Sequence, residues 1–318
     1  MTEGDLGMSA SVSTIEQRAK KSRKLAEAFE IGVHPLTLSR SESVTNDGYV
    51  LETLRFGNAA GESVRGYITR PQGVTSPMPA ILYIHAHGGR YEIGADELIA
   101  GRPALLSPLG AVFAGEGYLT LTIDLPCFGE RQHTSESALS KALLWHNRSL
   151  AGQMLGELHS ALDYLCTRTD VDAQSIAAFG ISMGATFAYW LAAVDPRIAA
   201  AAHLCCFADF ETMIASGAHD GHGIYLIVPG LLDLASNGEI VGLMAPRPQF
   251  VGLGGRDPLT PPDAVEKALA EARAAYEVAG AGDQFEVLIE PEGGHAETPA
   301  IRAAVLDFLA CNLKAPGF

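Results

Sequence analysis

The sequence contains one pattern that could hold an activated serine, Gly180-Ile181-Ser182-Met183-Gly184. An apolar run at residues 175–179 predicts a buried strand before it, and residues 185–193 predict a helix packed on a sheet after it. A serine at such a sharp strand-to-helix turn exposes its hydroxyl, and the turn needs glycines because a Cβ would crowd it. The pattern therefore predicts that Ser182 is a nucleophile, with an ordinary glycine turn as the alternative.

A nucleophilic serine also needs a base to take its proton and an acid to orient that base. His295 follows the last strand pattern in a glycine-rich loop, and Asp257 follows the strand pattern before it. The chain order is therefore serine, aspartate, histidine, and side chains at the carboxyl ends of adjacent strands can converge above a sheet. We predict a catalytic triad of Ser182, His295 and Asp257.

Four other carboxylates near the same two strand patterns could orient the histidine instead. They are Asp263, Asp283, Glu290 and Glu292. Asp263 is expected to begin the next helix and Asp283 to precede a strand, so Asp257 is the preferred acid.

Acyl transfer also needs donors for a tetrahedral oxyanion. One predicted donor is the backbone N–H of Met183, where a helix begins with unpaired N–H groups and a positive dipole end. The other is expected in the loop His85-Ala86-His87-Gly88-Gly89-Arg90, with the N–H of His87 preferred to that of Ala86. His-x-His without a nearby acidic ligand is a weak metal motif, so no metal is expected.

The elements that must position these residues follow a recognisable order. Two alternating runs joined by a glycine-containing segment predict an antiparallel hairpin, and continuous apolar runs alternating with helical patterns follow it. The expected strands are residues 49–56, 64–69, 80–85, 119–124, 175–179, 198–204, 248–253 and 285–289, and the main expected helices are residues 140–168, 185–193, 265–278 and 299–313. This predicts an α/β fold with a mostly parallel central sheet, antiparallel N-terminal strands and helices on both faces.

The chain is expected to have one main domain. Residues 1–47 are assigned to an N-terminal helical extension, with a charged helix at residues 13–30, and residues 48–318 to the α/β domain. Whether that helix packs on the body or forms contacts between copies stays open. Residues 207–245 are longer than one connecting helix requires, which predicts an insertion near the active site.

The substrate pocket is expected to be built from loops at the carboxyl edge of the sheet. The predicted contact residues are Gly88, Tyr91, Phe128, His222 and Tyr225. His219 and His222 are interpreted as parts of a tight loop rather than as metal ligands. Glu130 and Arg131 could pair to shape their loop, and whether they also bind substrate is left open.

Composition restricts the compartment and the partners. The net charge of −15 argues against nucleic acid and anionic membranes, which need a basic surface. The acidic N-terminus lacks the apolar core of a secretory signal, and no apolar run is long enough to span a bilayer. We therefore expect a cytoplasmic protein with free thiols at its five cysteines.

The motifs together resemble the α/β-hydrolase fold, in particular its dienelactone hydrolase-like and acetyl xylan esterase-like branch. The resemblance spans residues 48–313 and is carried by the segments at residues 83–89, 124–131, 180–184, 245–257 and 294–295. Dienelactone hydrolases carry a cysteine nucleophile where this chain has Ser182, so the resemblance implies an ordinary carboxylic ester rather than dienelactone. It implies a serine esterase that needs no cofactor.

The sequence therefore predicts hydrolysis of a small-molecule carboxylic ester through an acyl-enzyme. Two alternatives remain: a non-catalytic binding protein of the same fold, and a peptidase or carbon–carbon bond hydrolase with the same triad. The natural ester cannot be read from these residues, and a homo-oligomer is left open.

Overall fold

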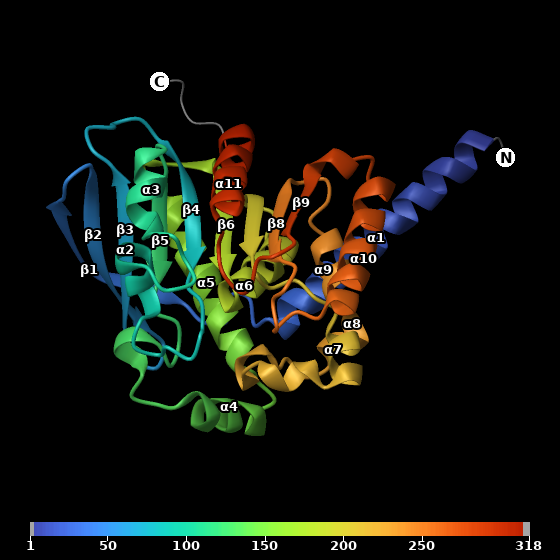
Figure 1. The fold of residues 1–318 in the computed structure, drawn as a ribbon, viewed down its shortest axis with the longest axis horizontal. Coiled ribbons are helices and arrows are strands. Elements are labelled where there is room, and N and C mark those ends of the chain that lie inside the picture. The colour runs from blue at the N-terminus through green and yellow to red at the C-terminus, as the bar shows by residue number, and fades with distance from the viewer. Residues whose placement is uncertain (1–2, 314–318) are drawn as a thin grey trace.

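The structure, a computed structural model, describes residues 3–313, with side chains from residue 16 onward (Figure 1). Residues 1–2 of the expected N-terminal extension and residues 314–318 of the expected α/β domain lie outside the described residues. The strands are β1 (Leu36–Thr45), β2 (Tyr49–Asn58), β3 (Ser63–Pro71), β4 (Met78–Ile84), β5 (Leu119–Ile123), β6 (Val171–Ile181), β7 (Ile198–Leu204), β8 (Gln249–Gly254) and β9 (Phe285–Glu290).

The described strands form one mixed sheet in the order β1-β2-β3-β5-β4-β6-β7-β8-β9. The pairs β1–β2, β2–β3 and β3–β5 are antiparallel, and every pair from β5–β4 to β8–β9 is parallel. The carboxyl ends of β4 to β9 therefore share one edge of the sheet. This confirms the predicted architecture of antiparallel N-terminal strands followed by a mostly parallel sheet.

Helices cover both faces of the sheet. The α-helices are α1 (Glu3–Ala28), α2 (Glu97–Ala100), α3 (Leu109–Gly115), α4 (Glu136–Trp145), α5 (Leu150–Thr167), α6 (Met183–Val194), α7 (Phe210–Ser216), α8 (Leu231–Leu234), α9 (Asn237–Gly242), α10 (Pro262–Val278) and α11 (Pro299–Asn312). In Figure 1, α3 and α11 lie in front of the strands, and α4 lies below them in the view. None of the helices within residues 3–313 combines the length and the apolar composition that crossing a bilayer requires.

The two faces of the sheet bury separate apolar cores, and β4 shows how one strand serves both. Ala80, Leu82 and Ile84 pack into the core beneath α5 and α6, whereas Ile81 and Tyr83 pack into the core beneath α3 and α11. Successive side chains of a strand point to opposite faces, so a strand covered on both faces reads as a continuous apolar run. This explains why the central strands were visible in the sequence.

Two boundaries differ from the sequence-based expectation. Residues 36–45, which were assigned to the helical extension, form the edge strand β1 and pair with β2 along its length. Most of β1 is exposed, so its sequence lacks the apolar alternation that reveals a half-buried strand. The expected helix at residues 140–168 is two helices, α4 and α5, because Asn147 between them has a φ of 56° that a helix does not allow.

The expected insertion is present between β7 and β8. It contains α7, α8, α9 and two short 3₁₀ turns, η3 (Ala218–Gly221) and η4 (Ile224–Leu226). Because β7 and β8 are parallel neighbours, this segment starts at the carboxyl edge of the sheet, where β6 delivers Ser182. The fold thus brings the insertion to the edge where the predicted site residues lie.

Candidate active site

Ser182 lies at a strained turn between β6 and α6. Its φ of 58° and ψ of −121° are a conformation that L-residues rarely adopt and that costs about 1–3 kcal/mol. A Cβ at Gly180 would lie 2.2 Å from the backbone of Gly184, and a Cβ at Gly184 would lie 2.0 Å from the Ile84 carbonyl oxygen. The two glycines are therefore required because the turn packs directly against itself and against β4.

The structure brings Ser182, His295 and Asp257 into one hydrogen-bonded chain. The Ser182 hydroxyl lies 2.8 Å from His295 Nε2, and His295 Nδ1 lies 2.7 Å from Asp257 Oδ2. A carboxylate accepts the Nδ1 proton, which leaves Nε2 free to accept the serine hydroxyl. Asp257 Oδ1 also accepts the Leu259 backbone N–H at 2.9 Å, which fixes the carboxylate.

The other expected carboxylates occupy different positions. Asp263 lies in the first turn of α10 and accepts the Ala264 N–H, while Glu292 forms an exposed ion pair with Arg256. Asp283 lies in a 3₁₀ turn just before β9. Of the predicted acids, Asp257 is the one in contact with the histidine, and its side chain is fully buried.

The two predicted oxyanion donors have backbone N–H groups that are free for a ligand. Among residues 16–313, the N–H groups of Met183 and His87 form no hydrogen bond. The Ala86 N–H, in contrast, donates to the Glu97 carboxylate, with distances of 3.0 Å and 3.3 Å to its two oxygens. The structure therefore favours His87 over Ala86 as the second donor.

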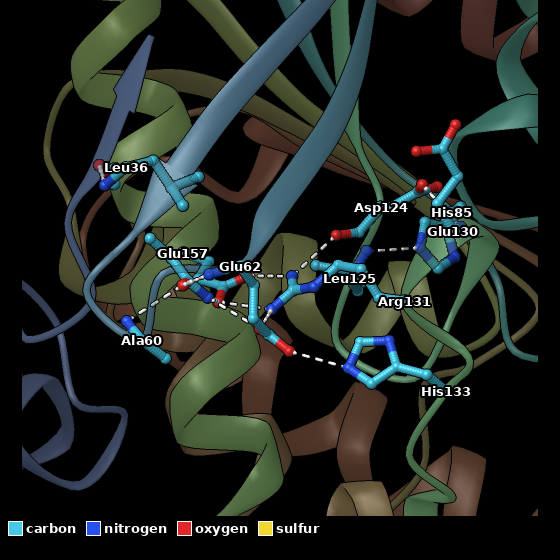
Figure 2. A network of polar contacts seen from close by, with 12 residues as sticks. Leu36, Ala60, Glu62, His85, Asp124, Leu125, Glu130, Arg131, His133 and Glu157 are labelled. Atoms are coloured by element: carbon cyan, nitrogen blue, oxygen red, sulfur yellow. Dashed lines mark hydrogen bonds and ion pairs between the residues drawn. The ribbon is translucent and has the colours of Figure 1, made fainter. Parts of the chain in front are cut away.

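His85 is a structural residue rather than a ligand. It is fully buried, and burial lowers the pKa of its imidazole to about 3, so the ring is neutral. Its Nε2 accepts the Leu125 N–H at 3.2 Å, a contact seen in Figure 2. Within the described residues, no three His, Cys, Asp or Glu side chains gather where they could hold a metal ion.

Three of the predicted pocket residues form an aromatic wall around His87. Its imidazole stacks on Tyr225 with ring centroids 4.7 Å apart and meets Tyr91 and Phe128 edge-on at 5.0 Å and 5.1 Å. Tyr225 reaches this wall from η4 in the insertion, and Phe128 from the loop after β5. The wall thus joins segments that are distant in sequence beside the proposed oxyanion donor.

Sequence reasoning missed Glu136, the first residue of α4, which connects this wall. Its carboxylate accepts His87 Nε2–H at 2.6 Å, the Tyr91 hydroxyl at 2.8 Å and the Tyr225 N–H at 3.2 Å. Burial would raise the pKa of Glu136, but the hydrogen bonds from His87 and Tyr91 lower it overall, so the carboxylate stays ionised. A glutamate at a helix N-terminus is common, and nothing local in the sequence marks this one.

The remaining predicted pocket residues, His222 and Gly88, are not among the rings that pack on His87. His222 Nε2 lies 2.9 Å from the Leu259 carbonyl oxygen, so this histidine packs on the loop that carries Asp257. His222 and His219 also line an apolar groove of about 540 Å³ within the insertion. Gly88 has a φ of 54°, and a Cβ there would lie 2.6 Å from Arg102. Glycine at this position therefore allows the backbone conformation of the loop and its close approach to Arg102.

A buried ionic network supports the loop after β5. Arg131 donates to Glu157 at 2.9 Å, to Glu62 at 2.8 Å and to the Asp124 carbonyl oxygen at 3.0 Å (Figure 2). Glu130 pairs instead with Arg55 on β2. Glu130 and Arg131 therefore shape the loop that carries Phe128, each through a partner other than its neighbour.

The five cysteines are free thiols. Cys127 is buried in the loop after β5, and burial raises the pKa of its thiol to about 11. A thiol with so high a pKa is a poor nucleophile at neutral pH. The Ser182 hydroxyl, in contrast, lies in hydrogen-bonding contact with an imidazole.

Comparison with known proteins relates the chain to hydrolases. Residues 64–212 match the model of the dienelactone hydrolase family. The chain is 36% identical over 276 residues to YtaP of Bacillus subtilis (strain 168), a protein named as a hydrolase, and the match covers 86% of this chain and 92% of that protein.

Solved structures share the fold at lower identity. A Bacteroides fragilis protein named as an acetyl xylan esterase matches with a TM-score of 0.68 and 21% identity, over 86% of this chain and 74% of that one. The acetyl xylan esterase of Paenibacillus sp. R4 matches with a TM-score of 0.63 and 20% identity, over 93% of each chain. These likenesses confirm the α/β-hydrolase fold.

Proposed function

Because the chain belongs to the dienelactone hydrolase family of α/β-hydrolase-fold hydrolases, we propose that it cleaves a small carboxylic ester through an acyl-enzyme on Ser182. The observation that carries the proposal is the unbroken hydrogen-bonded chain from Asp257 through His295 to Ser182. It occurs at a strained turn beside two free backbone N–H groups, which is the set of parts that acyl transfer needs.

The mechanism follows from the positions of these groups. His295 Nε2 takes the Ser182 proton while the serine oxygen attacks the ester carbonyl carbon, and the N–H groups of Met183 and His87 bind the resulting oxyanion. Collapse of this intermediate breaks the bond to the alcohol, which takes the proton from His295 and leaves. Water, deprotonated by His295, then attacks the acyl-serine. The second intermediate collapses with cleavage of the bond to Ser182 Oγ, which takes the proton back from His295, and the acid is released.

Asp257 acts through the histidine. Its carboxylate accepts the Nδ1 proton, which fixes the ring tautomer and stabilises the imidazolium that forms in each half-reaction. No step requires a cofactor. The chemistry is supplied by the triad and by two backbone amides.

Two observations support an ester of a small molecule. The nucleophile is serine, and the buried thiol of Cys127 is protonated at neutral pH, so a cysteine mechanism is disfavoured. Proteins of similar fold are named as acetyl xylan esterases and as a methylesterase, which makes esters with a short acyl or alcohol group the first substrates to test.

The proposal is tested by labelling and turnover in parallel. A fluorophosphonate probe should label the wild type and not Ser182→Ala, and the wild type should hydrolyse p-nitrophenyl acetate. A series of p-nitrophenyl esters of increasing acyl length defines acyl size, and matched anilides test peptidase activity. Ser175→Ala is the matched control, since Ser175 lies in the N-terminal half of β6, where its hydroxyl donates to the Asp172 carboxylate.

Three outcomes would contradict the proposal. A wild type that is neither labelled nor active would favour the non-catalytic binding protein. Equal labelling of Ser182→Ala would mean that the nucleophile is another residue. Faster cleavage of anilides than of esters would favour a peptidase.

A further inference from the structure

The peptide that joins Ala86 to His87 is held on one side by a buried ion pair. The Ala86 N–H donates to Glu97, and Arg102 Nη2 donates to the Ala86 carbonyl oxygen at 3.0 Å. His85 Nδ1 lies 3.1 Å from the same carbonyl oxygen. Arg102 and Glu97 also form an ion pair with each other, so they hold both polar groups of Ala86 together.

Because a peptide is planar, the contact that holds the Ala86 C=O also fixes the direction of the His87 N–H. The peptide between Ala86 and His87 is trans, so its C=O and its N–H point in opposite directions. Arg102 holds the C=O inside the protein, and the His87 N–H therefore points away from Arg102. The same loop lies against the serine turn, since a Cβ at Gly184 would be 3.0 Å from the His85 carbonyl oxygen.

Glu97 and Arg102 are almost completely buried, although burying an ion pair is not by itself an efficient way to stabilise a fold. Glu97 is fully buried, the Arg102 side chain is 5% exposed, and the buried Tyr83 hydroxyl donates to Glu97 at 2.6 Å. Buried ion pairs are often no more stabilising than apolar side chains of the same volume. Arg102 also fills the space beside Gly88, so the pair contacts the loop on both sides of His87.

We propose that Glu97 and Arg102 are positioning residues, which fix the Ala86–His87 peptide so that the His87 N–H is preorganised for the oxyanion. This inference rests on the proposed function and deepens it. Neither side chain touches the substrate. Their effect is transmitted through the backbone, and it matters most when negative charge develops on the substrate oxygen.

The first test is Glu97→Gln. The amide keeps one acceptor but lacks the charge that holds Arg102, so the loop peptide should reorient. We expect kcat to fall about 10- to 100-fold with KM within about twofold, because the lost interaction exists in the transition state. The matched control is Glu52→Gln on β2, which removes the charge that pairs with Arg70 of β3 and with Arg168 after α5 and should leave kcat unchanged.

The second test separates positioning from stability. Glu97→Gln combined with Arg102→Met removes both buried charges, so the free energy of unfolding should recover relative to Glu97→Gln. We expect kcat to stay low in the double variant. A trifluoromethyl ketone, whose adduct places an oxyanion in the same site, should lose affinity in proportion to kcat/KM.

A third variant with a smaller change tests the positioning role even if Glu97→Gln fails to fold. Tyr83→Phe removes one donor to Glu97 and keeps both charges, and it should lower kcat about two- to fivefold with the fold intact. A merely structural pair would give the opposite pattern. The double variant would then regain kcat together with stability, and Tyr83→Phe would keep wild-type kcat.

Measurements on the wild type separate failure of the proposed function from failure of the positioning role. If it neither turns over esters nor reacts with the fluorophosphonate probe, the proposed function fails. If the wild type is active and Glu97→Gln keeps its kcat and its affinity for the trifluoromethyl ketone, the positioning role of the pair is overturned while the esterase assignment stands.

Discussion

At the residue scale, the proposed chemistry depends on three side chains with different degrees of burial. The Asp257 side chain is fully buried. The His295 side chain is 22% exposed, so a substrate and water can reach it. Ser182 adopts a positive φ of 58°. A strained backbone at a residue that also contacts a base is typical of a nucleophile, because the sharp turn that causes the strain also exposes the hydroxyl.

Removal of the nucleophile or the base should nearly abolish turnover. We expect Ser182→Ala and His295→Ala to lower kcat by on the order of a thousandfold or more, since the members of such a triad act as a unit. The double variant should be no worse than either single variant. Steady-state hydrolysis of p-nitrophenyl acetate measures this, and near-normal turnover in either variant would refute the triad.

The orienting acid can be tested against its competitor. Asp257→Asn should lower kcat strongly, because an amide can stabilise the wrong tautomer of His295. Asp263→Asn should have little effect, since Asp263 contacts only the α10 backbone. A larger loss of kcat in Asp263→Asn than in Asp257→Asn would show that the acid is misassigned.

A buried histidine outside the site should set part of the acid sensitivity. His203 on β7 is 1% exposed, and burial lowers the pKa of its imidazole from 6.5 to about 3. The unfolded chain binds a proton near its ordinary pKa and the folded chain does not, so stability is lost as the pH falls from 6.5 towards 3. One such proton contributes a slope of about 1.4 kcal/mol per pH unit.

His203→Leu should therefore flatten the fall in the free energy of unfolding across this window. Urea unfolding followed at a series of pH values measures the slope. The exposed His146 supplies the control variant His146→Leu, which should keep the wild-type slope. An unchanged slope in His203→Leu would mean that this imidazole does not remain neutral in the folded chain.

At the element scale, the site depends on how closely α6 approaches β4. The N-terminus of α6 can deliver the Met183 N–H beside the loop after β4 because Gly184 has no side chain between the two elements. The same contact aligns the two backbone donors. The N-terminus of α6 and the end of β4 are thus in direct contact at the point where the oxyanion is proposed to form.

Gly184→Ala should disrupt this contact. Its Cβ would lie 2.0 Å from a backbone oxygen that cannot rotate away, so we expect a loss of about 3 kcal/mol in the free energy of unfolding together with loss of turnover. Gly115→Ala is the matched helical control: that glycine has open space around it and should be neutral or slightly stabilising. Equal effects of the two variants in urea unfolding would argue against the close approach.

At the scale of the whole molecule, the N-terminal extension is part of the core. Leu25 and Phe29 at the end of α1 are fully buried, and Phe29 stacks on Trp190 of α6 with ring centroids 5.0 Å apart. Arg18 donates to the Ala245 carbonyl oxygen at 2.7 Å. The carboxyl-terminal end of α1 therefore packs on the body, against α6, the helix that follows Ser182.

Phe29→Ala should accordingly destabilise the whole domain. We expect a loss of about 3–5 kcal/mol, because a fully buried aromatic ring is removed and a cavity remains beside Trp190. Val33→Ala, at a 54% exposed position just beyond, should cost less than about 0.5 kcal/mol. Unfolding followed by tryptophan fluorescence checks both, and a small effect of Phe29→Ala would mean that α1 is not integral to the core.

The order of the fold and the grouping of Ser182, His295 and Asp257 could be predicted from the sequence. Strands covered on both faces appear as apolar runs, and the serine turn has glycines at fixed positions, so both leave local signals. β1 could not be predicted as a sheet strand, because its side chains are mostly exposed and its pairing with β2 is made by backbone groups. The break at Asn147 also depends on one backbone angle that the sequence does not show.

The sequence by itself determined the chemistry that we propose for this chain, since the proposed nucleophile, base and acid lie after strands in a fixed order. Only the tertiary structure decided which groups position that chemistry. Glu97, Arg102 and Glu136 are separated from their loop partners by many residues, and their carboxylate and guanidinium groups find partners through packing. Local patterns record periodicity and turns, whereas a hydrogen bond between distant segments exists only once the chain has folded.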